Sequence, residues 1–168
     1  MQTKPNVVST DGETLDLKLY YYIGSQPSRA LLTLLELSGV FFEAIAVNML
    51  QGEHKSAAYL KINPNGAVPT LVMNGVVYLE SAATLRMLAS VLPTLESYYP
   101  DDPWQRHTID AALDFNGTVF RDKITKRSQL LLGGVEKAGP VSDAVQAQID
   151  DGNKEAQDGL RQLEELLT

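Results

Sequence analysis

The sequence AVPTLVMNGVVYLE, residues 67–80, contains two apolar runs on either side of Asn74 and Gly75. An Asn-Gly pair between apolar runs predicts a β-hairpin, because a type I′ turn needs positive φ at both central residues. Ser81 comes directly after this stretch and opens an apolar pattern of helical spacing that extends to Leu92. The stretch therefore predicts two antiparallel strands and then a helix.

Upstream of this hairpin, two further strands alternate with two helices. Leucines at every second position from Leu15 to Leu19 predict a strand that ends near Tyr22. The other elements are a helix that begins near Pro27 and ends at Gly39, a strand over 41–47 and a short helix over 53–62. The full order is β-α-β-α-β-β-α, which predicts an α/β domain with a mixed sheet and helices packed against it.

The chain changes character after Leu92. The segment PTLESYYPDDP, residues 93–103, contains prolines and consecutive aspartates and predicts a linker. The remaining sequence predicts helix, first from Trp104 to about Leu132 and then along an apolar stripe up to Leu167. We therefore expect a flexible N-terminal tail, an α/β domain, a linker and a partial all-α domain, bounded by residues 1–14, 15–93, 94–103 and 104–168.

The composition excludes several classes of function. The formal net charge is −7, whereas nucleic acids and anionic membranes require a basic surface. The chain has no cysteine, which excludes a disulfide, a thiolate metal site and a cysteine nucleophile, and its two histidines lack metal-binding spacing. No apolar run approaches the roughly 20 residues of a membrane helix, and the polar N-terminus is not a signal peptide. We expect a cytoplasmic protein without a metal and without a nucleic-acid or membrane partner.

Three segments are similar to the cytosolic glutathione S-transferases, and to theta-like members in particular. They are LKLYYYIGSQPSRA (17–30), GEHKSAAYLKINPNGAVPTL (52–71) and YLESAATLRML (78–88). The resemblance is dense from Leu15 to Leu92 and rests mainly on helical order beyond Trp104. It implies a thioredoxin-like N-terminal domain and, after it, an all-α domain. Members of the family carry further helices, so the helical domain is expected to be truncated here.

The resemblance implies that Ser25 is the catalytic residue and that its hydroxyl stabilises the glutathione thiolate. Lowering a thiol pKa from about 8.5 by about 2 units requires roughly 2.7 kcal/mol. A hydrogen bond to a charged group contributes about 1.5–3 kcal/mol and a helix N-terminus about 0.3–1 kcal/mol, which together suffice. Two alternatives remain open. Ser25 is also a preferred residue for capping a helix, and Tyr22 at the end of the strand is the runner-up for the catalytic hydroxyl.

The resemblance also implies which residues bind the rest of glutathione. Ser81 is expected to bind the γ-glutamyl carboxylate, because the unpaired amides of a helix start favour an anion. Glu80 is expected to lie near the γ-glutamyl ammonium group, as a pair of opposite charges. Gln26 is expected to help position the same end. Val68 is expected to pair with the tripeptide through its backbone, which a cis bond to Pro69 exposes. Without the resemblance, a serine cap and an edge-strand proline would explain these residues equally well.

Cations for the second carboxylate of glutathione are few. His54 and Lys55 open the short helix after Gly52 and are candidates for binding the glycine carboxylate, although a solvated helix start would also explain them. Relatives often have a lysine directly before the Val-Pro pair, where this chain has Ala67, so we expect weaker glutathione binding. Arg29 is expected to face solvent or to pair with an acid.

The function implied is a detoxifying transferase. The glutathione thiolate, stabilised by Ser25, would attack an electrophilic small molecule, with glutathione as co-substrate and no cofactor. A non-catalytic glutathione-binding or protein-interaction module is the alternative, and a glutathione-dependent peroxidase is a lesser one. The resemblance implies a homodimer, for which the apolar residues Met49, Leu50, Leu88 and Tyr98 are contact candidates.

Overall fold

The chain forms two compact units, which divide between Pro100 and Asp101. The structure is a computed structural model and describes residues 7–8, 11–12, 14–124 and 142–167. The expected order, an α/β unit and then helices, is confirmed.

The first unit contains a mixed four-stranded sheet with the order β4-β3-β5-β6. The strands are β3 (Leu17–Tyr21), β4 (Glu43–Ala46), β5 (Thr70–Met73) and β6 (Val76–Tyr78). Strand β4 lies parallel to β3, whereas β5 is antiparallel to both β3 and β6. Asn74 and Gly75 have φ of 51° and 79°, so the predicted hairpin turn with two positive φ angles is confirmed.

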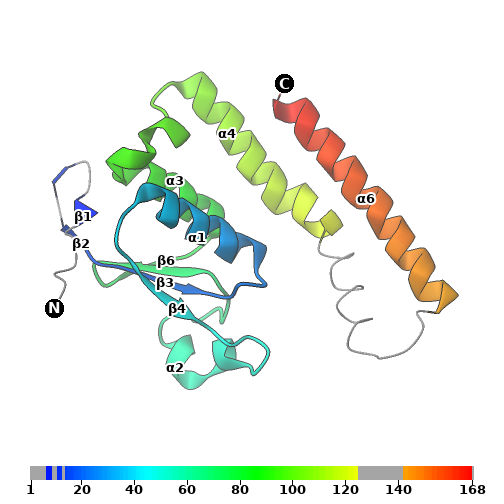
Figure 1. Cartoon of the computed structure of the whole chain (residues 1–168), viewed down its shortest axis with the longest axis horizontal. Helices are drawn as coiled ribbons and strands as arrows, with labels where there is room; N and C mark the ends of the chain where they lie inside the picture. Colours follow the sequence, from blue (N-terminus) through cyan, green and yellow to red (C-terminus); the bar gives the residue numbers. More distant parts are fainter. Residues whose placement is uncertain (1–6, 9–10, 13, 125–141, 168) are drawn as a thin grey trace. The chain divides into compact units, whose positions relative to one another are not determined.

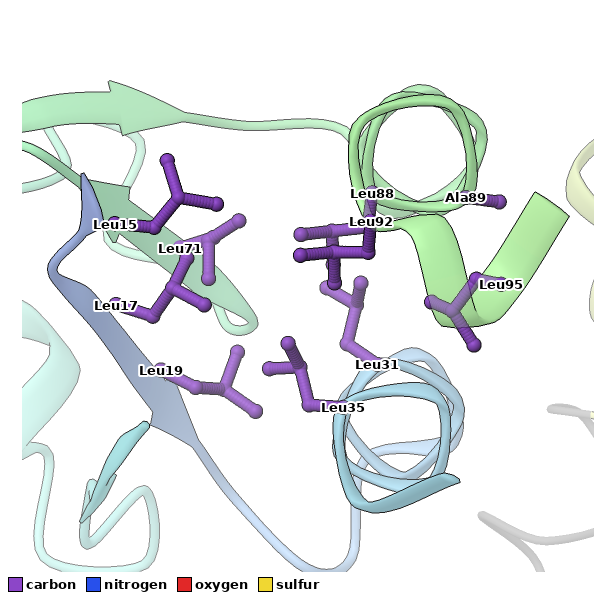
Figure 2. Packing of buried hydrophobic residues seen from close by; sticks show 10 residues of the cluster. All are labelled: Leu15, Leu17, Leu19, Leu31, Leu35, Leu71, Leu88, Ala89, Leu92 and Leu95. Carbon is purple, nitrogen blue, oxygen red and sulfur yellow. The ribbon is translucent and has the colours of Figure 1, made fainter. Parts of the chain in front are cut away.

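Two long helices cover one face of this sheet. Helices α1 (Gln26–Ser38) and α3 (Ser81–Val91) lie side by side over this face (Figure 1). Leu17 and Leu19 point from the sheet toward them (Figure 2). The short helices η1 (Glu53–Lys55) and α2 (Ala57–Leu60) replace the single helix predicted over 53–62. The two are separate because Ser56 is extended, with φ −66° and ψ 150°, and its hydroxyl accepts from the Tyr59 N–H as a new cap.

A cluster of leucines fills the space between the sheet and these helices (Figure 2). Leu19, Leu35 and Leu71 have no exposed surface, and each fully buried leucine contributes about 1.5–3 kcal/mol to folding. The cluster consists of Leu15, Leu17, Leu19, Leu31, Leu35, Leu71, Leu88, Ala89, Leu92 and Leu95. The core thus joins β3 to α3, which is distant in the sequence.

One dimer-contact candidate is wrong, because Leu88 belongs to this core and has no exposed surface. The helical spacing of α3 turns Leu88 toward the sheet, so it cannot reach another chain. Leu50 and Tyr98 are 82% and 51% exposed, and Met49 is half-buried. These three remain the candidates for a dimer contact.

The ends of the α/β unit contain more structure than the expected tail and linker. Strand β1 (Val7–Val8) pairs antiparallel with β2 (Thr14–Leu15) within residues predicted as a flexible tail. The 3₁₀-helix η2 (Pro93–Tyr98) occupies the start of the predicted linker. Leu95 from η2 is fully buried in the core, and the Thr94 hydroxyl donates to the Ser38 carbonyl at 2.9 Å. Both contacts attach this segment to the α/β unit.

The second unit is helical. Helix α4 (Pro103–Phe115) is capped by Asp102, whose carboxylate accepts from two amides of the first turn. The single helix predicted from Trp104 to about Leu132 is interrupted by a π-helical segment, η3 (Asn116–Phe120), and residues 125–141 lie outside the described part. Helix α6 (Asp143–Leu167) coincides with the predicted apolar stripe and packs against α4 and η3. None of the described helices is both long and apolar enough to span a membrane.

We expect the substitution Leu71→Ala to lower the free energy of unfolding by about 2–5 kcal/mol, because it leaves a cavity at the centre of the leucine cluster. The matched control is Leu37→Ala on α1, since Leu37 is 59% exposed and its substitution should change stability by about 0.5 kcal/mol or less. Urea unfolding of the three proteins would measure both changes. Equal losses for the two variants would contradict this assignment of the core.

Candidate functional site

The sheet brings all the predicted site residues to one end, where β3, β4 and β6 finish and β5 begins. Parallel strands β3 and β4 end there; the Ser25 turn follows β3, and a loop over residues 47–52 leads from β4 to His54 and Lys55. Strand β5 runs the other way, so it begins at this end, directly after Val68 and Pro69. Strand β6 is antiparallel to β5 and ends there, before Glu80 and Ser81. Four loops separated in the sequence therefore meet at the same end of the sheet (Figure 1).

Ser25 caps helix α1 and keeps its hydroxyl hydrogen available. Its backbone is extended, with φ −83° and ψ 120°, and its Oγ accepts from the Ser28 N–H at 3.4 Å, a long hydrogen bond. Within the described residues, the Ser25 hydroxyl donates to no acceptor. Capping and donation to a ligand are therefore compatible, because a hydroxyl accepts with its lone pairs and donates with its hydrogen. Gln26, half-buried, is the first residue of the helix.

The turn before Ser25 is held by contacts that the sequence did not reveal. The Ser25 N–H donates to the Tyr22 carbonyl at 2.9 Å and closes the turn. Arg29 is exposed, as expected, but its guanidinium donates to the Ile23 carbonyl at 2.9 Å instead of pairing with an acid. The Tyr22 ring lies against Gly24, where a Cβ would come within 2.4 Å of the ring. Tyr22, the runner-up for the catalytic residue, therefore lies on the same turn as Ser25.

Val68 and Pro69 are joined by a cis bond, as the family resemblance implied. The Val68 N–H has no acceptor among the described residues, which leaves it available to an extended peptide. Sequence reasoning missed the buried side chains behind this loop. Asn63 and Thr70 are 2% and 0% exposed, and both hydrogen-bond at the loop. In the sequence, the feature that could have indicated these residues is the polar Thr70 at the start of an apolar strand.

His54 and Lys55 lie against the same loop. The Lys55 ammonium donates to the Asn65 carbonyl at 3.2 Å, and a Cβ on Gly66 would come within 2.8 Å of both the His54 carbonyl oxygen and Lys55 Nζ. The Nδ1 atom of His54 is buried and has no hydrogen-bond partner in the described structure. Ala67 itself is exposed and supplies no charge. His54 and the Lys55 ammonium group therefore lie next to the loop that contains Val68.

The start of α3 has unpaired amides. The N-cap is Glu80 and not Ser81, which is the first residue of the helix, and no side chain caps the helix. Glu80 has φ 62°, an uncommon conformation for a residue with a side chain. The Thr84 hydroxyl donates to the Leu79 and Glu80 carbonyls at 3.2 and 3.0 Å and helps to hold this turn. The alternative of Ser81 as a simple serine cap is therefore wrong, and the first amides remain open to an anion.

One group near this end of the sheet has a shifted pKa. Burial raises the pKa of Tyr59 above 10.0, and hydrogen bonds with Thr70 and Asn63 partly offset the shift. Tyr59 therefore remains a neutral hydroxyl at physiological pH. The described residues contain no group of three or more His, Asp or Glu side chains placed to hold a metal ion.

Residues 25–91 match the family model of the glutathione S-transferase N-terminal domain. The chain is 36% identical to glutathione S-transferase D7 of Anopheles gambiae over 104 residues, 61% of this chain and 48% of that protein. It is 32% identical to human glutathione S-transferase theta-2 over 107 residues, 64% of this chain and 44% of that protein. The chain spans about half the length of these curated relatives.

Solved structures agree with these matches. Human glutathione transferase theta-2, in complex with glutathione, superposes with a TM-score of 0.75 and 26% identity over 86% of this chain and 58% of that one. The theta-class enzyme of Xanthomonas axonopodis pv. citri, with glutathione bound, has a TM-score of 0.72 and 25% identity over 84% and 65%. Residues 25–91 are therefore similar to glutathione S-transferase N-terminal domains, and the fold of the chain is similar to that of theta-class structures.

We expect Gly66→Ala to destabilise the protein more than Gly75→Ala does. Both glycines have positive φ, which costs an alanine roughly 1–2 kcal/mol. A Cβ at position 66 also collides with the His54 carbonyl oxygen, whereas position 75 has open space within 4 Å. Chemical denaturation would measure the difference. Equal losses in the two variants would contradict the close packing of the His54 segment on this loop.

Proposed function

We propose that this protein is a glutathione transferase in which Ser25 stabilises the glutathione thiolate for attack on an electrophilic small molecule. The observation that carries the proposal is the Ser25 hydroxyl, which caps α1 with its oxygen and has no acceptor for its hydrogen in the described structure. The relatives are named glutathione S-transferases, and two of the solved neighbours were determined with glutathione bound.

The free energy needed to lower the pKa of the glutathione thiol is consistent with a serine hydroxyl that donates a hydrogen bond to the thiolate. A hydrogen bond from Ser25 to the thiolate would contribute about 1.5–3 kcal/mol, and the N-terminus of α1 about 0.3–1 kcal/mol. Together they offset the roughly 2.7 kcal/mol needed to lower the thiol pKa by about 2 units. No general base is required, because the serine does not act as a nucleophile.

The remaining loops fit an extended tripeptide with two carboxylates and one ammonium group. The open amides at Ser81 would bind the γ-glutamyl carboxylate, with Glu80 and Gln26 near the ammonium group. The unpaired Val68 N–H would bind the peptide backbone between them. His54 and Lys55 would bind the glycine carboxylate at the other end.

Other properties of the protein come from the same proposal. We place the reaction in detoxification and the protein in the cytoplasm, and we expect a homodimer. A glutathione-binding module without chemistry would retain the same loops, so binding without turnover would select that alternative. Turnover of a hydroperoxide instead of an aryl halide would select the peroxidase.

We expect Ser25→Ala to lower the rate with a chromogenic aryl halide about 10- to 100-fold at neutral pH, while the protein still binds glutathione resin. The lost hydrogen bond should return the bound thiol pKa toward about 8.5, which a pH profile of the rate would reveal as a shift to higher pH. Tyr22→Phe is the matched control and should retain turnover. A rate unchanged by Ser25→Ala but lost in Tyr22→Phe would move the catalytic hydroxyl to Tyr22.

We expect Ala67→Lys to tighten glutathione binding about two- to tenfold, because it adds a cation beside the glycine carboxylate. Ala147→Lys adds the same charge to α6 in the second unit and serves as the control. Isothermal titration at low and moderate salt would measure both affinities. No change in the Ala67 variant, or an equal change in the control, would contradict the placement of that carboxylate.

A further inference from the structure

Three side chains from separate parts of the α/β unit converge on the carbonyl oxygen of Ala67. The Tyr59 hydroxyl lies 2.7 Å from this oxygen and Asn63 Nδ2 lies 2.9 Å from it. Thr70 Oγ1 lies 3.0 Å from the Tyr59 hydroxyl and 2.9 Å from Asn63 Nδ2, and 3.3 Å from the carbonyl. Tyr59, Asn63 and Thr70 come from α2, the turn after it and β5, and we call them the Ala67 clamp.

The hydrogens of the clamp can be assigned so that each is used once. Tyr59 donates to the Ala67 carbonyl over the shortest distance, and Thr70 then donates to the Tyr59 oxygen. Asn63 donates one amide hydrogen to the carbonyl and the other to Thr70, while its Oδ1 accepts from the Asn65 N–H at 3.0 Å. The result is a closed ring of hydrogen bonds, in which the bonds that run from Asn63 through Thr70 and Tyr59 to the Ala67 carbonyl polarise one another.

The clamp is buried, so its groups have no alternative partners in water. Tyr59, Asn63 and Thr70 are 5%, 2% and 0% exposed, and the Tyr59 ring packs edge-to-face on Tyr20 at 5.9 Å between centroids. Removing one member therefore leaves buried donors or acceptors unpaired. Such a ring favours a single position of the Ala67 carbonyl.

The Ala67 carbonyl and the Val68 N–H belong to the same peptide plane. In a trans peptide these two groups point in opposite directions, and the cis bonds of the described residues do not include Ala67-Val68. A carbonyl fixed from inside therefore fixes the N–H that points outward. We propose that Tyr59, Asn63 and Thr70 are positioning residues that preorganise the Val68 N–H for the peptide backbone of glutathione. This inference rests on the proposed function, because it assumes that Val68 binds glutathione.

The variant Thr70→Val tests this role, because it removes the hydroxyl while preserving the shape of the side chain. Thr70→Ser restores the hydroxyl and is the rescue variant. Ser38→Ala is the matched control, since Ser38 is also a buried hydroxyl that donates to a carbonyl, Leu35 at 2.6 Å, but lies at the far end of α1. Isothermal titration would give the glutathione Kd, and kinetics at saturating glutathione would give kcat.

We expect Thr70→Val to raise the glutathione Kd and KM about tenfold, the scale of a lost hydrogen bond, with kcat unchanged within about twofold. Thr70→Ser and Ser38→Ala should keep the Kd within about twofold of the original protein. A purely structural role would lower the folded fraction without changing the Kd of the folded protein. An unchanged Kd in a folded Thr70→Val protein would overturn the inference, and Tyr59→Phe provides the same test if Thr70→Val does not fold.

A measurement without ligand separates this inference from the proposed function. The ¹⁵N order parameter of the Val68 amide should be about 0.85, as in rigid backbone, in the original protein and lower in Thr70→Val. A mobile Val68 amide in the original protein would overturn the clamp. If instead the amide is rigid and responds to Thr70→Val but glutathione does not bind, the proposed function fails while the clamp stands as a device that orders this loop for another ligand.

Discussion

The pairing of β3 with β5 is the constraint on which the rest of the structure depends. Tyr20 lies opposite Thr70 and Leu19 opposite Leu71, so the end of β3 meets the beginning of β5. This register places the Ser25 turn beside the Val68 loop and points alternate leucines into the core. A shift by one residue would exchange the two faces of the strand. The leucine core therefore fixes the geometry of the candidate site as well as the stability of the fold.

The candidate site contains hydrogen-bond donors that have no partner within the described residues. Ser25 satisfies one amide of α1 and retains a hydrogen, α3 begins without a side-chain cap, and the Val68 N–H has no acceptor in the described structure. Each of these is a donor at the same end of the sheet. The ligand proposed here is an extended tripeptide with a carboxylate at each end. These donors can form hydrogen bonds to such a ligand without a metal or a cofactor. The net charge of −7 gives no general attraction for such a ligand, so these local groups must supply it.

The residues that hold the site differ in kind from those expected to touch the ligand. Arg29 was expected to face solvent or an acid, yet it bonds the backbone of the turn before Ser25. Tyr59, Asn63 and Thr70 had no expected role, yet together they bond the carbonyl before Val68. Their partners are backbone carbonyls, and a carbonyl leaves no mark in a sequence. For this reason, residue types and spacing suggested candidate ligand contacts but did not indicate the contacts that support them.

The sequence by itself determined the order of elements, the Asn-Gly hairpin and the helix that begins after Ser25, because these depend on local periodicity and on turn residues. Only the tertiary structure decided that Leu88 is in the core and unavailable to a partner, and that Leu95 attaches the expected linker to the α/β unit. It also decided that Glu80 rather than Ser81 occupies the N-cap position of α3, without a side-chain cap. Local pattern shows which side of a helix is apolar, but not what covers it. The partner of each face is fixed by packing between segments far apart in the chain, which no single stretch of sequence contains.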